Sequence, residues 1–131
     1  MTTPARQTEY QVVHYLRKKS IAFGSTTTQS YLGTIPANSL ILKPDSGVHV
    51  VTAFNAGTTN TLDIGTTTTT TLWGSALALG TTTFVPLDEA VGGYRVTVDT
   101  DVYYKLNQAG TAATTGDADI VISYIPHGDR D

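Results

Sequence analysis

The stretch YLGTIPANSLILKPDSGVHVVTAFNAGTTNTLDIGT, residues 31–66, decides the fold. Short apolar runs alternate in it with turn residues, and the runs cover 39–43, 48–55 and 61–65. Pro36 and Pro44 bracket the first run, and proline marks strand ends because it lacks the amide proton. Asp, Ser, Asn and Gly fill the gaps, as is typical of turns. We therefore predict three strands joined by short turns, which would form an antiparallel meander.

Side-chain alternation in this stretch also indicates strands. Val48 and Val50 share one face and His49 lies on the other, because successive side chains of a strand point to opposite faces. Leu62 and Ile64 alternate with polar residues in the same way. Each of these strands therefore has one apolar face that a core can bury.

The rest of the chain continues the same pattern. Further strands are expected at 9–16, 20–23, 26–32, 67–73, 81–87, 94–98, 102–106 and 118–125, with a helical turn at 74–80. The Arg17-Lys18-Lys19 run is expected to interrupt the first strand, and 94–98 to form a hairpin with 102–106. Turn signals every ~8–12 residues predict an all-β antiparallel sandwich. We expect it to be jelly-roll-like, with a short extended N-terminal arm at 1–8, one sandwich domain at 9–126 and a C-terminal tail at 127–131.

Composition limits what the chain can do. With 131 residues it can form one domain with its own core, and with no cysteine it has neither disulfides nor thiolate metal sites. Threonine supplies 25 residues, which favours exposed strand faces that are polar but uncharged. No signal peptide or membrane span is expected, because no apolar run is long enough. The absence of cysteine fits assembly in a reducing cytoplasm.

Charge is unevenly distributed along the chain. Residues 1–43 carry five basic residues against one acid, whereas residues 44–131 carry three against ten. This pattern has two interpretations: chance spread over a folded surface, or a polar molecule whose basic side docks on an acidic partner. Three clustered charges on a negative chain are too few to indicate a nucleic-acid site.

No set of residues suggests catalysis. The three histidines are isolated, and a zinc site has no supporting motif. The Asp99/Asp101 and Asp117/Asp119 pairs could reach a calcium ion, but we expect them to cap turns. No nucleophile elbow is present. We therefore expect no enzyme activity, no metal, no cofactor and no small-molecule substrate.

The strand punctuation resembles that of small structural proteins of tailed bacteriophages. Their recurring form is a Gly-Thr-x-Pro-Ala lead-in, an apolar strand, a Val/Thr/Ala-Phe strand, and a strand that ends in Leu-x-Ile/Val-Gly. The corresponding pieces here lie at 33–37, 40–42, 50–54 and 62–65, and 116–125 resembles their final strand. The resemblance covers roughly residues 31–125. It implies a virion component, most plausibly a capsid decoration or cement protein without catalytic residues.

On this hypothesis the protein is made in the host cytoplasm and binds the outer capsid surface. Its partners would be the major capsid protein and further copies of itself, as a dimer or trimer, with no nucleic acid and no membrane. Candidate contact residues are the basic ones near the N-terminus and two aromatic ones: Arg6, Arg17, Lys18, Lys19, Trp73 and Tyr103. Tyrosine suits an interface because it buries a large ring and keeps a hydrogen bond.

Two alternatives stay open. One is a binding module on a tail or fibre that recognises a carbohydrate or receptor, with a site formed by Trp73, Asp99 and Asp101. The other is an inert structural adaptor in the tail.

Overall fold

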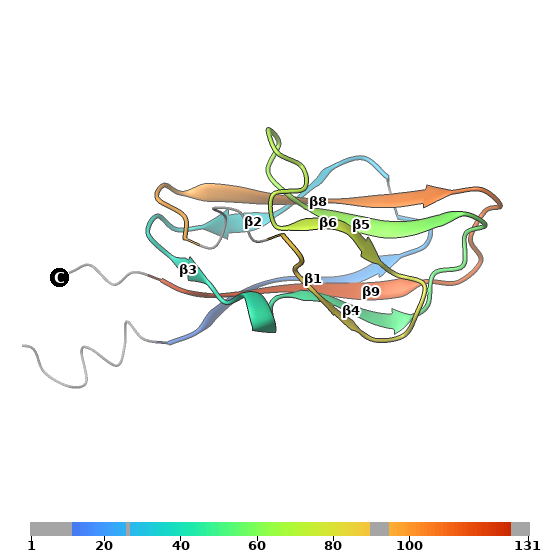
Figure 1. Cartoon of the computed structure of the whole chain (residues 1–131), viewed down its shortest axis with the longest axis horizontal. Helices are drawn as coiled ribbons and strands as arrows, with labels where there is room; N and C mark the ends of the chain where they lie inside the picture. Colours follow the sequence, from blue (N-terminus) through green and yellow to red (C-terminus); the bar gives the residue numbers. More distant parts are fainter. Residues whose placement is uncertain (1–11, 26, 90–94, 127–131) are drawn as a thin grey trace, which may run out of the picture.

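The protein is a sandwich of two antiparallel sheets (Figure 1). The computed structural model describes residues 12–25, 27–89 and 95–126. Sheet A has the order β1-β9-β4-β7, and its strands are β1 (His14–Ala22), β9 (Asp117–Ile125), β4 (Gly47–Thr52) and β7 (Phe84–Pro86). The short β3 (Leu40–Ile41) also pairs with β9. Sheet B has the order β2-β8-β5-β6, with β2 (Ser30–Ile35), β8 (Thr100–Ala109), β5 (Thr59–Gly65) and β6 (Gly74–Ala78). The predicted all-β antiparallel sandwich is confirmed.

The chain crosses repeatedly between the sheets. Only two pairs of consecutive strands lie in the same sheet: β3 with β4, and β5 with β6, which also pair directly. Every other step from one named strand to the next passes to the other sheet. When β3 and β4 are counted as one interrupted strand, each sheet holds four strands. This arrangement fits the double-sheet, eight-strand plan of a jelly roll.

One core fills the space between the sheets. Fully buried side chains come from both layers, including Val48 and Ile120 of sheet A and Leu62, Ile64 and Leu106 of sheet B. The predicted alternation holds in β4, where Val48 and Val50 are buried and His49 is exposed. Apolar burial of this kind is the main stabilising contribution in a chain without disulfides.

A short 3-10 helix, η1 (Lys43–Asp45), separates β3 from β4. Both strands pair with β9, so the intervening segment must leave the sheet and return to it. Ser46 closes the gap: its hydroxyl donates to the carbonyl of Leu42 at 2.7 Å and accepts the N–H of Ser123 at 2.9 Å. The hydroxyl thus replaces a missing backbone partner of β9, which explains a fully buried serine.

The predicted meander of 39–65 is wrong. The first two of its strands, β3 and β4, lie end to end along β9, and the third, β5, belongs to the other sheet. Strand alternation is a local signal, but the choice of partner strand depends on long-range packing that this stretch does not specify.

The basic run does not interrupt the first strand. Arg17 and Lys18 pair in register with Val121 and Ile120 of β9, and strand β1 continues to Ala22 through a register shift that includes Lys19. Charged side chains are tolerated here because β1 lies at the edge of sheet A. The part of the expected strand at 9–11 lies outside the described residues.

Two other predictions between β5 and β7 are wrong. Residues 67–73 form turns, because the Thr66 hydroxyl accepts the N–H of Thr69 at 2.9 Å and so competes with sheet pairing. The expected helical turn at 74–80 is strand β6 and its continuation, with Leu77 and Leu79 buried and Ala78 exposed between them. A two-residue period outweighs the helical preference of Ala and Leu.

The predicted hairpin of 94–98 with 102–106 does not form. Strand β8 pairs with β2 and β5 instead. Val96 is buried, and its backbone forms hydrogen bonds with Asn38 and Ser39, the two residues that precede β3. Val98, which the alternation placed with Val96, is 65% exposed.

The predicted arm at 1–8 and tail at 127–131 lie outside the described residues. Within the part that is described, no helix is both long enough and apolar enough to cross a bilayer.

Candidate docking surfaces

Three consecutive candidate cations of strand β1 are exposed, and they are here called the basic edge: Arg17, Lys18 and Lys19. Arg17 forms an ion pair with Asp119 of the neighbouring strand at 3.0 Å, and its side chain is 57% exposed. The structure therefore brings together three of the four predicted basic contact residues. Arg6, the fourth, lies outside the described residues.

Asp119 fixes the shape of the basic edge. Its two carboxylate oxygens accept the backbone N–H of Ser20 at 2.8 Å and the guanidinium of Arg17 at 3.0 Å. Ser20 has a φ of 59°, a left-handed conformation that is unusual for a residue other than glycine. The Ser20 hydrogen bond, and then Arg17, lower the pKa of Asp119 against the opposing effect of partial burial. The carboxylate therefore holds the bulge that separates Lys18 from Ile21.

The sheet edges are poorly suited to adding a foreign strand. Strand β1 has a bulge and cations, β7 has three residues and ends at Pro86, and β2 and β6 each have a register shift. Short edges, proline, bulges and lysine are the devices by which proteins prevent edge-to-edge pairing. Contact through the faces of the sheets, or through side-chain charge, is thus favoured over strand addition.

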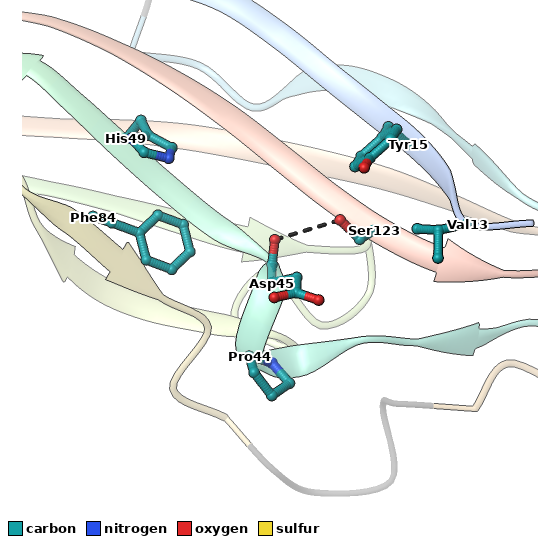
Figure 2. Close-up of a pocket in the computed structure, with 7 residues that line it drawn as sticks. All are labelled: Val13, Tyr15, Pro44, Asp45, His49, Phe84 and Ser123. Atoms are coloured by element: carbon teal, nitrogen blue, oxygen red, sulfur yellow. Dashed lines mark hydrogen bonds between the residues drawn. The ribbon is translucent and has the colours of Figure 1, made fainter.

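The outer face of sheet A is hollowed, and Figure 2 shows the side chains around the depression. We call it the sheet A hollow; it has a volume of about 510 Å³ and is lined by Val13, Tyr15, Pro44, Asp45, His49, Phe84 and Ser123. Tyr15 is 64% exposed, and the rings of His49 and Phe84 lie 5.0 Å apart. Asp45 lies in the middle of the labelled side chains in Figure 2.

The lining of the hollow combines aromatic rings with the small Ser123. The Ser123 hydroxyl donates to the backbone carbonyl of Asp45 at 3.4 Å. Gly47, two residues after Asp45, pairs with Val121 and Pro86 across the sheet, and a Cβ there would lie 2.2 Å from the carbonyl oxygen of Val85.

Sequence reasoning did not identify this hollow. Alternation placed His49 opposite the core, but no sequence signal brings Tyr15 from the first strand beside residues 44–49 and 84. That proximity follows from the order β1-β9-β4-β7.

The outer face of sheet B is mainly polar. Tyr103 is half-buried and contacts Tyr31 edge to face, with the ring centroids 5.5 Å apart, whereas Tyr104 is buried. Asn107 donates to Asp63 at 3.1 Å. Of the two neighbouring tyrosines, Tyr103 is therefore the one on the outer face, and its role as a contact residue stays a prediction.

Trp73 cannot serve as a contact residue in this fold. It is 1% exposed and belongs to the core. The alternative site of Trp73, Asp99 and Asp101 fails for the same reason. Its two carboxylates also have partners: Asp99 accepts the N–H of Ala37 at 2.9 Å, and Asp101 accepts the hydroxyl of Thr34 at 2.7 Å.

No cluster of three His, Cys, Asp or Glu side chains that could hold a metal occurs among the described residues. Asp99 and Asp119 use their carboxylates to bind backbone N–H groups, as expected of residues that stabilise turns and bulges.

Comparison with known proteins finds one solved structure with a similar fold. No protein-family model and no curated protein sequence matches the chain. Among solved structures, a chain of the cyanophage Pam1 capsid asymmetric unit is similar, with a TM-score of 0.63 and 21% identity. The match covers 88% of this chain and 86% of that one. The two proteins thus share an architecture over almost their whole lengths.

Proposed function

We propose that the protein is a structural component of a bacteriophage virion that binds the outer capsid surface and stabilises the shell. The observation that carries this proposal is the fold similarity, over 88% of this chain, to a chain of a cyanophage capsid. The strand punctuation of residues 31–66, which resembles that of small phage structural proteins, supports it independently.

The basic edge supplies the charge for docking. Arg17, Lys18 and Lys19 are exposed on one strand, and an acidic patch of the major capsid protein would complement them. Each exposed ion pair contributes only about 0.2–1 kcal/mol. A single contact of this kind is therefore weak, and binding must depend on several contacts per copy or on linked copies, a dimer or trimer, that bind together.

Stabilisation follows from mass action. A protein that binds the assembled shell and not its separated subunits shifts the equilibrium towards the shell. Copies that lie across junctions between capsomers would oppose their separation without a chemical reaction. The proposed role is therefore non-catalytic and needs no cofactor.

A second candidate is a binding module on a tail or fibre. The observation in its favour is the sheet A hollow, because its tyrosine, histidine and phenylalanine rings could stack on a sugar or a receptor side chain. This candidate requires binding to host cells or glycans, whereas decoration requires binding to shells.

Sedimentation separates the two candidates. Purified protein is added to phage shells that lack it, and the shells are pelleted. Saturable uptake at a fixed ratio per capsomer is expected for decoration. Absence of uptake by shells, together with binding to host cells or a glycan array, would instead identify the binding module. Deletion of residues 1–8 tests the predicted arm: we expect weaker uptake by a protein that still folds.

A further inference from the structure

A register shift in strand β2 places Tyr31 and Thr34 on the same face of sheet B, where their side chains meet. The pairing of Tyr31 with Tyr103 is followed by this shift before Gly33. In a regular strand, two residues three apart would point to opposite faces. Bulges are common on edge strands and next to functional sites, where they re-aim a side chain, and β2 is an edge strand of sheet B.

The ring of Tyr31 is 54% exposed and is nevertheless held in one orientation. The Thr34 hydroxyl donates its only proton to the carboxylate of Asp101 at 2.7 Å, so the Tyr31 hydroxyl donates to Thr34. The Tyr31 ring also contacts Tyr103 edge to face, with the ring centroids 5.5 Å apart. Holding an exposed side chain costs conformational entropy, and a ligand that stacks on the fixed ring does not have to supply that cost on binding.

The loop between β5 and β6 lies beside this pair of rings. Gly65 of β5 pairs with Tyr103 on the side away from Tyr31, and a Cβ on Gly65 would lie 2.3 Å from the carbonyl oxygen of Thr69. The loop therefore covers the position next to Tyr103, and Figure 1 shows it rising from the outer side of sheet B. Residues 66–71 are all threonine, so the loop presents neutral hydroxyl groups next to the rings.

The charges near the two rings have opposite signs. Asp101 and Lys105 are exposed on the outer face of β8, two residues on either side of Tyr103. Asp63, opposite Lys105 on β5, uses its two carboxylate oxygens to accept one backbone N–H and one side-chain amide. A carboxylate accepts hydrogen bonds, an ammonium group donates them, and hydroxyl groups do both. These surroundings fit a neutral ligand that carries several hydroxyl groups better than they fit an ion.

We propose that this surface, here called the tyrosine platform, binds a neutral pyranose unit of a glycan; its residues are Tyr31, Thr34, Asp101, Tyr103 and Lys105. A pyranose has a face of C–H groups, which stacks on an aromatic ring, and a rim of hydroxyl groups. The exposed Tyr31 ring takes the C–H face, and the hydroxyl groups reach Asp101 and Lys105. The platform lies on the opposite sheet from the sheet A hollow, and it does not require the protein to be part of a virion.

Titration followed by NMR tests the platform. Full-length protein with labelled tyrosine rings is titrated in turn with cellohexaose, maltohexaose, mannohexaose and chitohexaose at millimolar concentration. At least one of the four is expected to shift the ring signals of Tyr31 and Tyr103 saturably, and no shift with any of them would overturn the proposal. Tyr31→Ala is expected to weaken that binding about fivefold or more. The matched control is Tyr15→Ala, a tyrosine of similar exposure in the sheet A hollow, which should leave binding unchanged.

Two further readouts make the test sharper. A loss of binding with Tyr15→Ala in place of Tyr31→Ala would put the glycan in the sheet A hollow and overturn the proposal. Thr34→Val keeps the Tyr31 ring but removes the hydroxyl that holds it, so it should weaken binding about two- to threefold with little change in Tm. Unchanged affinity of Thr34→Val would contradict the proposed role of the fixed ring. Uptake of Tyr31→Ala by shells should equal that of the wild type, so failure here is distinguishable from failure of the proposed function.

Discussion

Replacement of Asp119 should destabilise the protein more than replacement of its ion-pair partner. Asp119→Ala removes the acceptor of two hydrogen bonds, from the backbone N–H of Ser20 at 2.8 Å and from Arg17 at 3.0 Å. The Asp119 side chain is 17% exposed, so its bond to the backbone counts nearly in full, and hydrogen bonds to charged groups contribute about 1.5–3 kcal/mol. The Arg17 side chain is 57% exposed, and solvent screening reduces its share to below about 1 kcal/mol.

We therefore expect Asp119→Ala to lower the free energy of unfolding by about 2 kcal/mol at neutral pH. For a chain of this length that loss lowers Tm by about 7 °C. Asp119→Asn, which keeps an oxygen for the Ser20 N–H but loses the charge, should cost about 0.5–1 kcal/mol. Arg17→Ala is the matched control and should cost less than Asp119→Ala. Urea unfolding followed by circular dichroism measures all three.

The contribution of Asp119 to the stability of the fold should decrease as the pH is lowered into the acid range. The folded-state pKa of Asp119 is lowered from its ordinary value of 3.8. The charged carboxylate therefore stabilises the fold fully above that value, and the stabilisation is lost as the pH falls through the lowered folded-state pKa. The stabilities of the wild type and Asp119→Asn should converge in acid. Equal costs for Asp119→Ala and Arg17→Ala, or a difference from Asp119→Asn that does not change with pH, would refute this account of the bulge.

Three further substitutions test other parts of the structure. Trp73→Ala should destabilise by about 3–5 kcal/mol in urea unfolding because the ring is buried in the core; a cost below about 1 kcal/mol would contradict that placement. Gly47→Ala should lower Tm markedly, because a Cβ would lie 2.2 Å from the Val85 carbonyl oxygen. Gly80→Ala is the control and should have little effect on Tm, because a Cβ there meets nothing within 4 Å. Similar effects of the two substitutions would contradict the close packing of β4 on β7. Reversing both charges with Lys18→Glu/Lys19→Glu should reduce uptake by shells in sedimentation without changing Tm, and unchanged uptake would exclude the basic edge from docking.

Local alternation identified the buried faces of β4 and β5 correctly, but it misplaced Val98 and did not identify strand partners. The buried residues of β4 and β5 follow the sequence pattern because a strand has a fixed period of two. The same rule would have identified β6, where Leu77 and Leu79 alternate with alanine, but helix-forming composition suggested a turn of helix instead. Partner choice, as in the pairing of β9 with both β1 and β4, joins segments up to about a hundred residues apart.

For the candidate surfaces too, the sequence revealed local features but not those that depend on long-range packing. The Arg17-Lys18-Lys19 run was visible in the sequence as a cluster of exposed charge, and it is exposed in the structure. Trp73 was predicted to be a contact residue only because it is a large aromatic residue. Its burial depends on packing in the core between the two sheets, which no local sequence pattern reveals. The sheet A hollow is lined by residues from four separate strands and η1, so it could be identified only from the topology.

Cryo-electron microscopy of shells with and without the added protein tests the proposed function most directly. The difference map is expected to show a β-sandwich on the outer surface of the shell, at junctions between capsomers, with the basic edge of β1 facing the shell. Density confined to the tail, or shells that look identical with and without the protein, would contradict the proposed role.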